Sequence, residues 1–431
     1  MEENLTRFGI SGAKVYQKGA FSLVDLLVED GRVFVFSVGT LPTDIPVFDM
    51  NTCFVFPGFT DVHTHLREPG FSYKETVETG TKAAAHGGYT AVCAMPNLNP
   101  VPDSVEHLKK EIEEIEKQAV ISVYPYGAIT IGQKGEALSD LEGMAPFVLA
   151  FSDDGKGVQS DDMMRDAMKR AKALGKMIVA HCEDESLIPK GGCIHDGAFA
   201  KANGLIGIPS SSEYAQVARD IELVRETGVR YHVCHVSTKE SVELIKKAQQ
   251  EGLSVTGETG PHYLTLTEDD LIDEGRFKMN PPLREKADQE ALLAAVNDGT
   301  LCAIATDHAP HSEEEKSKGL AHSNMGIVGL ETAFAVLYTD LVKTGKMSLE
   351  TLIERMATSP AQRFSLGSGE IEDGGLANLT VFSLDEAYTI DPKDFLSMGK
   401  ATPYAGKEVF GKCLLTVANG EIAYKEENIH A

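Results

Sequence analysis

Between residues 53 and 305 the chain alternates short apolar runs with longer amphipathic segments, and this alternation restricts its possible folds most strongly. Such a pattern is typical of parallel strands joined by crossover helices. The apolar runs are residues 53–59, 90–94, 121–128, 147–151, 177–180, 231–234, 253–256 and 301–305. The helical patterns are residues 105–118, 162–174, 213–227, 239–251 and 289–297. Eight strands with helices between them predict an α/β fold, a (β/α)8 barrel of the TIM type.

The two ends of the chain have a different pattern, with short β segments separated by turn residues. These segments are residues 14–16, 22–28, 32–38, 379–382, 413–417 and 421–424. The last two flank Asn419-Gly420, a strong signal for a two-residue hairpin turn. We therefore predict a small β-sandwich-like domain built from both termini, residues 1–52 plus 367–431, beside a barrel formed by residues 53–366.

Charge and composition exclude several classes of partner. The formal net charge is −25, whereas proteins that bind nucleic acid gather Lys and Arg to displace counterions, so we expect no nucleic-acid partner. An anionic substrate would need specific local cations. Apolar runs are too short to span a bilayer, which predicts no membrane association, and the first residues lack a signal-peptide pattern. The seven cysteines include no Cys-x-x-Cys pair and are expected to be reduced thiols. We expect a cytoplasmic protein.

Polar residues follow the apolar runs where a barrel would have its active site. In (β/α)8 barrels the active site lies at the C-terminal ends of the strands, so these residues should converge. Only the run at residues 121–128 ends without an obvious ligand. The residues after the other runs are His63, His65, Asn97, Asp153, Asp154, His181, His235, His262 and Asp307.

A metal explains this set of residues better than ordinary polar packing does. His63 and His65 stand two apart on a predicted strand, so both imidazoles project from the same face. Alone, a His-x-His pair is a weak signal. His181, His235 and Asp307 each follow a different strand, and so many buried nitrogen and oxygen groups would be costly without a cation. Imidazole and carboxylate ligands suit zinc.

Five segments, in order along the chain, resemble class I dihydroorotases of the amidohydrolase superfamily. The His-Leu-Arg-Glu-Pro-Gly stretch is the most discriminating, whereas His-x-His and the late Asp mark only the superfamily. The segments are Gly-Phe-Thr-Asp-Val-His-Thr-His-Leu-Arg-Glu-Pro-Gly at 58–70, Met-Pro-Asn at 95–97, His-Cys-Glu-Asp at 181–184, Lys-Met-Asn-Pro-Pro-Leu-Arg at 278–284 and Ala-Thr-Asp-His-Ala-Pro-His at 305–311.

The resemblance implies the ligands of one or two zinc ions. It assigns His63 and His65 to a first zinc and His181 and His235 to a second. Where related hydantoinases bridge two metals with a carboxylated lysine, this chain has Asp153-Asp154-Gly155-Lys156. Spacing to the following histidine favours Asp154 as the ligand, with Asp153 as a neighbour. Lys156 is badly placed to bridge.

Asp307 is the expected metal ligand and catalytic acid/base. A zinc-bound water ionises near neutral pH and can attack the ring amide. A carboxylate that touches the metal and this hydroxide can take the proton and pass it to the leaving nitrogen. Ring closure would use the same residue in reverse. The implied reaction is the reversible cyclisation of N-carbamoyl-L-aspartate to (S)-dihydroorotate in pyrimidine synthesis.

Arg67 is the residue expected to select the substrate. Its planar fork can bind a carboxylate at two points, and it shares a face with His65 on an extended segment. The alternative is a surface ion pair with Glu68. The resemblance implies that Arg67 and Asn97 hold the substrate carboxylate. The other residues implied near the substrate are His65, Asn280, His311 and the Met325-Gly326 backbone.

The chain departs from the family motifs at one position. Tyr263 stands where many relatives carry a second histidine, which places one contact in doubt.

Another cyclic amidohydrolase activity (dihydropyrimidinase, hydantoinase or allantoinase) is a close alternative function, with Arg67 and Asp154 as the discriminating features. A non-catalytic relative that binds aspartate carbamoyltransferase is the alternative from another class, although such chains typically lose metal ligands. An active enzyme could also bind that transferase, and homodimers are usual among similar enzymes. Six histidines have no place in the pattern and are expected to be structural or exposed: His86, His107, His195, His232, His322 and His430.

Overall fold

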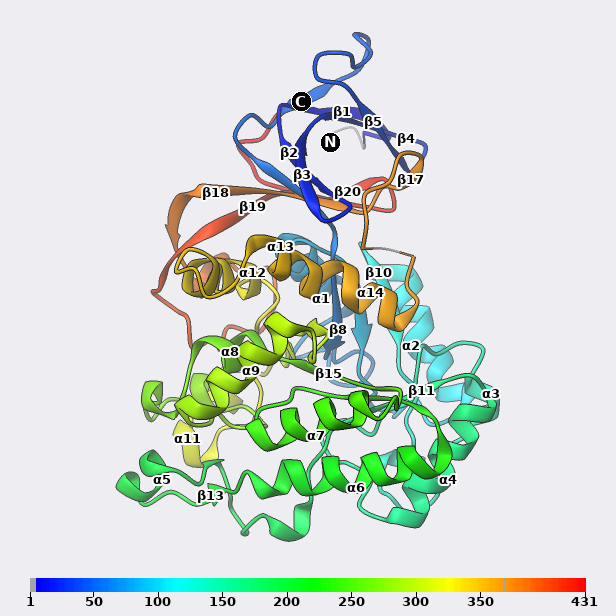
Figure 1. The fold of residues 1–431 in the computed structure, drawn as a ribbon, viewed down its shortest axis with the longest axis vertical. Helices are drawn as coiled ribbons and strands as arrows, with labels where there is room; N and C mark the ends of the chain where they lie inside the picture. The colour runs from blue at the N-terminus through cyan, green and yellow to red at the C-terminus, as the bar shows by residue number, and fades with distance from the viewer. Residues whose placement is uncertain (1–4, 368) are drawn as a thin grey trace.

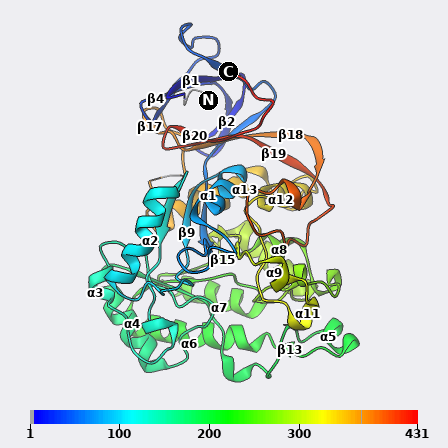
Figure 2. The same cartoon turned by 180° about the vertical axis from the view of Figure 1, so that it is seen from behind.

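Residues 5–367 and 369–431 are described by a computed structural model with a mixed α/β fold. Both termini lie at one end of the molecule, among short strands, and the long helices α6 (Ser211–Thr227) and α7 (Lys239–Gln250) lie at the opposite end (Figure 1). The view from behind shows the same separation of strand-rich and helix-rich ends (Figure 2).

Strands from the two ends of the chain combine in two sheets. The first has the order β17-β5-β4-β1-β6 and the second the order β20-β19-β18-β7-β2-β3. Both are mainly antiparallel, with parallel pairs β1/β6 and β2/β7. The strands are β1 (Arg7–Ser11), β2 (Lys14–Gln17), β3 (Ala20–Leu23), β4 (Asp25–Glu29), β5 (Arg32–Phe36), β6 (Val47–Asp49), β7 (Phe54–Pro57), β17 (Gly375–Leu376), β18 (Leu379–Thr389), β19 (Glu408–Ala418) and β20 (Glu421–Lys425).

The two sheets share one core of buried apolar side chains. Phe8 and Leu26 come from the first sheet, and Val55 and Val381 come from the second. The predicted hairpin turn is confirmed, because β19 pairs antiparallel with β20 around Asn419-Gly420. Both turn residues have positive φ, 53° and 83°, as a two-residue type I′ turn requires.

The middle of the chain forms parallel strands. Two sheets have the orders β10-β9-β8 and β11-β14-β15-β16. Single bridges pair Gly127 with Phe151, Phe151 with Ile178, and Thr64 with His308. The strands are β8 (Phe59–Thr64), β9 (Tyr89–Ala94), β10 (Ser122–Pro125), β11 (Met177–Ala180), β14 (Arg230–Val233), β15 (Val255–Thr259) and β16 (Ala303–Ile304), with the short pair β12 (Ile194–His195) and β13 (Gly207–Ile208).

Two of the predicted strands need correction. The run at residues 53–59 is divided, because β7 pairs with β18 and β2 of the terminal sheet whereas β8 begins the parallel sheet. Gly58 lies between them, and a Cβ there would come within 2.2 Å of the Thr90 side chain. The run at 147–151 forms no strand and contributes only the bridging residue Phe151. Apolar composition predicts burial at these positions but not the partner strand.

The predicted helices agree with the structure to within three residues at each end. A short helix, α10 (Glu313–Lys316), follows His311, and its Ser312 cap accepts from the Glu315 amide. The remaining helices are α1 (Val77–His86), α2 (Val105–Gln118), α3 (Leu141–Met144), α4 (Asp161–Ala173), α5 (Ala198–Asn203), α8 (Pro261–Thr265), α9 (Lys286–Asp298), α11 (Gly319–His322), α12 (Ala333–Leu337), α13 (Leu349–Ile353) and α14 (Ser359–Phe364).

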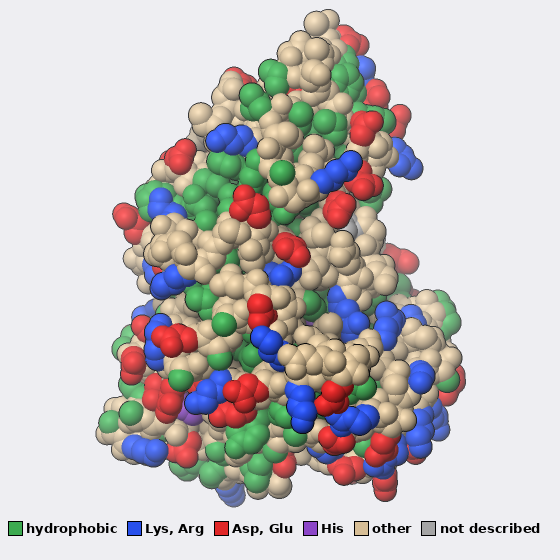
Figure 3. Space-filling view, viewed as in Figure 1, with side chains coloured by type: hydrophobic (Ala, Val, Ile, Leu, Met, Phe, Trp, Pro, Cys, Tyr) green, Lys and Arg blue, Asp and Glu red, His purple; other side chains and the backbone are tan. Residues whose placement is uncertain are grey.

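All seven cysteines lie in the described part of the chain and are free thiols, as expected. Within residues 5–367 and 369–431, none of the helices has the length and apolar character needed to cross a bilayer. On the face shown in Figure 3, acidic and basic side chains are interspersed.

Candidate metal centre and substrate cavity

The six residues predicted as metal ligands come together although they are spread along most of the chain. His63 lies on β8, and each of the others lies shortly beyond a strand or, for Asp154, beyond the bridging residue Phe151. The carboxyl ends of parallel strands meet at one edge, which explains this convergence. All six are buried: His63, His65, Asp154, His181, His235 and Asp307.

His63 and His65 face the two carboxylates. The Nε2 atom of His63 lies 3.4 Å from an oxygen of Asp154 and 3.4 Å from an oxygen of Asp307. The Nε2 atom of His65 lies 3.0 Å from Asp307 and 3.5 Å from Asp154. Both carboxylates therefore lie in reach of both imidazoles.

His181 and His235 approach Asp154 from another direction. Their facing nitrogens, Nδ1 of His181 and Nε2 of His235, are 2.8 Å apart. Oδ1 of Asp154 lies 3.8 Å from the first nitrogen and 3.7 Å from the second. Asp154 thus borders both histidine pairs, as a residue shared by two ion positions would.

The donor atoms of this cluster fit a cation. Nε2 of His63 and Oδ1 of Asp154 are buried and lack a hydrogen-bond partner among the described residues. Leaving such groups unpaired costs free energy that coordination would recover. The groups whose ligand atoms lie within 4.8 Å of one another include His63–His65–Asp154, His63–His235–Asp307 and Asp154–His181–His235.

The protonation states of Asp154 and Asp307 also favour a bound cation. Burial opposes ionisation of Asp307, yet His63 and His65 lower the pKa of its carboxyl below the ordinary value. Burial likewise opposes ionisation of Asp154, but His63 and His235 lower its pKa well below the ordinary value. Both residues are therefore carboxylates at neutral pH, the form that binds a cation.

Asp153 and Asp154 have different surroundings. The carboxylate of Asp153 accepts from the backbone amides of Ile129 (2.8 Å) and Thr130 (3.1 Å) and from the Thr130 hydroxyl. Asp153 thereby holds the segment that follows β10, the one run with no predicted ligand. The structure places Asp154 in the cluster and Asp153 outside it, in agreement with the preference for Asp154.

Glu258 supports the cluster and was not predicted. Its Oε1 accepts from Nδ1 of His63 at 2.7 Å, and its Oε2 accepts from Nε2 of His232 at 3.0 Å. A carboxylate behind a metal-binding imidazole fixes the tautomer and directs the other nitrogen toward the metal. The position of Glu258 at the end of an apolar run was the available sequence signal. His232, thought to be structural, contributes by holding Glu258.

Backbone geometry also positions the site. Asp61 accepts from the amides of His63 (3.0 Å) and Thr306 (3.0 Å), which ties the end of β8 to the segment carrying Asp307. Asp307 and His235 have positive φ, 48° and 32°. Non-glycine residues rarely adopt this conformation, and it is concentrated at functional sites.

A cavity of about 220 Å³ opens over the cluster. Every predicted substrate-binding residue lines it, whereas His63 lies beneath it and is fully buried. The lining residues are His65, Arg67, Asn97, Asp154, Gly155, His181, His235, Asn280, Asp307, Ala309, His311, Met325 and Gly326.

Arg67 is directed into the protein rather than paired with Glu68 on the surface. Its Nε donates to the carbonyl oxygen of Pro310 at 3.2 Å, and its Nη2 lies 3.5 Å from Nε2 of His311. Arg67 has a positive φ of 64°, so it does not share the extended face of His65 that the sequence predicted. The change of backbone direction still leaves its guanidinium in the cavity wall.

The two asparagines are held by neighbouring groups. Nδ2 of Asn97 donates to the backbone oxygen of Asp154 at 2.7 Å, and Nδ2 of Asn280 donates to Glu183 at 3.0 Å. Glu183 also lies 3.3 Å from Nε2 of His181 and so connects Asn280 to the metal cluster. Each amide keeps a second N–H for a ligand.

Tyr263 takes a supporting role at the site of the sequence departure. It is buried, and its hydroxyl donates to the carbonyl oxygen of Pro281 at 2.6 Å, next to Asn280. This hydrogen bond fixes the segment that carries Asn280.

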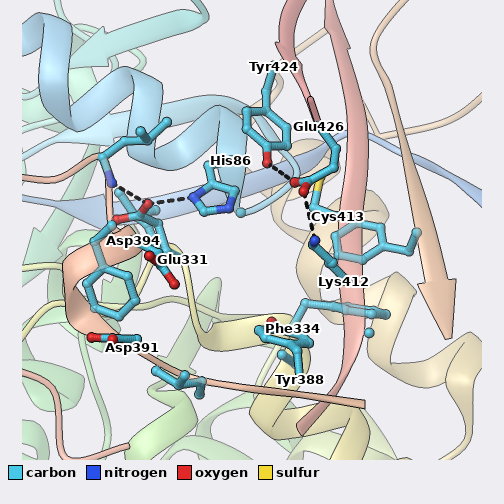
Figure 4. A pocket seen from close by; sticks show the side chains of 18 of the residues that line it. His86, Glu331, Phe334, Tyr388, Asp391, Asp394, Lys412, Cys413, Tyr424 and Glu426 are labelled. Atoms are coloured by element: carbon cyan, nitrogen blue, oxygen red, sulfur yellow. Dashed lines mark hydrogen bonds and ion pairs between the residues drawn. The ribbon is translucent and has the colours of Figure 1, made fainter. Parts of the chain in front are cut away.

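A second and larger cavity, of about 590 Å³, lies apart from the metal cluster (Figure 4). Four of its ionisable side chains form two pairs: His86 with Glu331 at 2.7 Å, and Lys412 with Glu426 at 2.8 Å. The hydroxyl of Tyr424 also donates to Glu426. These pairs give His86 the structural place expected of it.

Comparison with solved structures defines the class of protein. The L-hydantoinase (dihydropyrimidinase) from Arthrobacter aurescens has a TM-score of 0.87 and 26% identity, with 98% of this chain and 97% of that chain covered. The dihydropyrimidinase from Brevibacillus agri has a TM-score of 0.84 and 23% identity, covering 99% and 97%. The fold is therefore that of the cyclic amidohydrolases.

Sequence comparison gives the family within this class. The model of a family described as dihydro-orotase-like matches residues 53–241. The dihydroorotase of Bacillus cytotoxicus is 47% identical over 420 residues, 97% of this chain and 98% of the relative. That of Fusobacterium nucleatum is 48% identical over 421 residues, 97% and 99%. The chain belongs to the dihydroorotase family.

Proposed function

We propose that the protein is a zinc-dependent dihydroorotase, which interconverts N-carbamoyl-L-aspartate and (S)-dihydroorotate in pyrimidine synthesis. The observation that carries this proposal is the cavity in which Arg67 and Asp307 line the same small volume. One end offers a guanidinium for a carboxylate, and the other offers a cluster suited to a metal ion and amide hydrolysis. Dihydroorotate has both a carboxylate and a cyclic amide.

The proposed ligands are His63 and His65 for one zinc and His181 and His235 for a second, with Asp154 between them and Asp307 beside the first. Imidazole nitrogens with carboxylate oxygens are a ligand set that zinc favours. When bound, the metal polarises the attacked carbonyl group and increases the acidity of a water molecule.

The side chains of this chain perform the remaining steps. The carboxylate of Asp307 takes a proton from the attacking water and delivers it to the ring nitrogen as the amide bond breaks. In ring closure it removes the proton from the ureido nitrogen. Arg67 and the second N–H of Asn97 bind the substrate carboxylate, while Asn280, His311 and the Met325-Gly326 backbone surround the ring. His65 lines the same cavity.

We further propose that the parallel strands close as a (β/α)8 barrel and that the terminal sheets form a sandwich. The bridges at Phe151 and between Thr64 and His308 support closure, because they join the two parallel sheets at both ends. The common core of the two terminal sheets supports the sandwich. The domain boundaries at residues 53 and 366 stay predictions. β7 lies just after the first boundary, yet it pairs with a strand of the terminal domain.

The alternatives have less support. The hydantoinase and dihydropyrimidinase relatives share the fold at 23–26% identity, whereas the dihydroorotases are 47–48% identical. The clustered ligands oppose a purely structural role. A homodimer, an aspartate carbamoyltransferase complex and a cytoplasmic location stay predictions.

The decisive experiment compares purified protein on dihydroorotate, dihydrouracil, hydantoin and allantoin, before and after treatment with a chelator. We expect dihydroorotate to be turned over fastest, activity to fall on chelation, and added zinc to restore it. Faster turnover of dihydrouracil or allantoin would reverse the assignment, and full activity without metal would refute the metal centre.

A further inference from the structure

Lys74 lies directly behind His311, on the side of the ring away from the substrate cavity. Its ammonium nitrogen is 3.3 Å from Nδ1 of His311 and 2.9 Å from Oε1 of Glu315. The side chains of Lys74 and His311 are only 11% and 8% exposed. Lys74 belongs to the segment between β8 and α1, so it connects the loop of Arg67 to the loop of His311.

Glu315 holds the other side of this arrangement. Its Oε2 lies 3.2 Å from Nδ1 of His311 and accepts from the Ser312 amide at 3.1 Å. The hydroxyl of Tyr73 donates to Oε1 at 3.4 Å. Nδ1 of His311 therefore faces both a cation and a carboxylate, and it could accept from Lys74 or donate to Glu315.

The opposite nitrogen of His311 decides between these possibilities. Nε2 lies 2.8 Å from the carbonyl oxygen of Met325, which can only accept, so Nε2 carries a proton. A neutral imidazole has one N–H, which leaves Nδ1 as the acceptor for Lys74. Burial, together with the Arg67 and Lys74 cations, lowers the pKa of His311 to about 3, so the ring is neutral at physiological pH.

This tautomer fixes one wall of the substrate cavity. His311 and Arg67 line the cavity together with Met325 and Gly326. The Nε2–H group of His311 holds the carbonyl oxygen of Met325 at 2.8 Å. The opposite tautomer would direct a lone pair at that carbonyl oxygen and repel it.

We propose that Lys74, anchored by Glu315, is a positioning residue that keeps His311 neutral with its proton on Nε2, so that His311 holds the Met325-Gly326 backbone in place beside the substrate. The identity of that substrate rests on the proposed function. Lys74 acts in two ways, by donating to Nδ1 and by neutralising Glu315, which otherwise draws a proton onto Nδ1.

The direct test is nitrogen-15 NMR of histidine-labelled, full-length protein as isolated with its metal, with the His311 signals assigned from the His311→Asn spectrum. We expect a neutral Nε2–H tautomer in the wild type. Lys74→Met leaves Nδ1 facing the Glu315 carboxylate alone and should produce either an imidazolium or the Nδ1–H tautomer. The double variant Lys74→Met/Glu315→Gln removes that carboxylate and should restore the Nε2–H tautomer.

Kinetics provide the second test. Lys74→Met should lower kcat/KM for dihydroorotate about tenfold, the loss expected when one hydrogen bond that holds the cavity wall is broken. In a His311→Asn background the same substitution should cause no further loss, because Lys74 acts through His311. Lys82→Met is the matched control, since Lys82 forms an exposed pair with Glu78 away from the cavity.

An Nδ1–H or imidazolium signal in the wild type, or an unchanged His311 signal in Lys74→Met, would overturn the inference. An equal loss in the presence and absence of His311 would show that Lys74 acts otherwise. The spectrum requires no turnover, so wild-type protein inactive on dihydroorotate would refute the proposed function and still leave the tautomer measured.

Discussion

Oε1 of Glu258 lies 2.7 Å from Nδ1 of His63, and this contact determines which nitrogen of His63 faces the metal cluster. A proton on Nδ1 is held by this carboxylate, so Nε2, which faces Asp154 and Asp307, is the nitrogen that would present its lone pair to a metal. Both groups are fully buried, which strengthens the interaction. The geometry of the first predicted ligand thus depends on a residue about two hundred positions away in the sequence.

Glu258→Gln should weaken metal binding by about tenfold or more, because the amide retains an acceptor but removes the negative charge behind His63. Competition with a chromophoric chelator measures the affinity. Glu243→Gln, at an exposed position of α7, serves as the control for a loss of one negative charge. An affinity equal to that of the wild type would show that Glu258 only fills space.

Asp153→Asn and Asp154→Asn should separate stability from metal binding. Asp153→Asn keeps the metal but should lower the free energy of unfolding by about 1–3 kcal/mol, because the donors at residues 129–130 lose a charged acceptor. Asp154→Asn should weaken metal affinity by about tenfold or more. Metal analysis and urea unfolding on both variants check this, and the reverse pattern would make Asp153 the ligand.

Asp307→Asn should reduce turnover of dihydroorotate by at least about a hundredfold, because an amide cannot carry the proton from water to the ring nitrogen. The circular dichroism spectrum and the unfolding midpoint should stay close to those of the wild type. Retention of more than about a tenth of the activity would argue against a proton-transfer role.

Arg67→Lys should lower kcat/KM for dihydroorotate by about tenfold or more, since an ammonium cannot reproduce two parallel N–H contacts. The loss should be much smaller for dihydrouracil, which lacks the carboxylate. Equal losses on the two substrates would mean that Arg67 supports the cavity wall without selecting the substrate.

Lys316 should make stability depend on pH. Its ammonium is buried and donates to the carbonyl oxygens of Lys278 (2.9 Å) and Asn324 (2.7 Å). Burial and the Lys278 cation lower the pKa of Lys316 to about 7 from its ordinary 10.5. Between these values the unfolded chain binds more protons, so the free energy of unfolding should rise with pH, by at most about 1.4 kcal/mol per pH unit.

Urea unfolding of wild type and Lys316→Met between pH 7 and the ordinary pKa of lysine tests this, with the exposed Lys318→Met as the control. The wild type and the control should gain stability relative to Lys316→Met as the pH increases. Parallel curves for all three proteins would show that the pKa of Lys316 is not lowered.

The sequence alone was sufficient to predict the ligand set and the parallel βα pattern. Apolar periodicity predicts strands, and polar residues directly after parallel strands must gather at one edge of the sheet. The sequence alone therefore assigns His63, His181, His235 and Asp307 to one site. Local signals were also sufficient for the Asn419-Gly420 hairpin, because its positive φ values need those residue types.

Tertiary structure decided what depends on contacts between distant segments. Pairing of β7 with the terminal sheet and the inward turn of Arg67 at positive φ both depend on neighbours that no local pattern specifies. Three supporting contacts could be found only in the three-dimensional structure. They are made by the carboxylates of Glu258 and Glu183 and by Lys74 behind His311. The residue type determines which chemistry a side chain can perform. Burial and hydrogen-bond partners depend on the whole fold, and they determine which atom of that side chain faces the site.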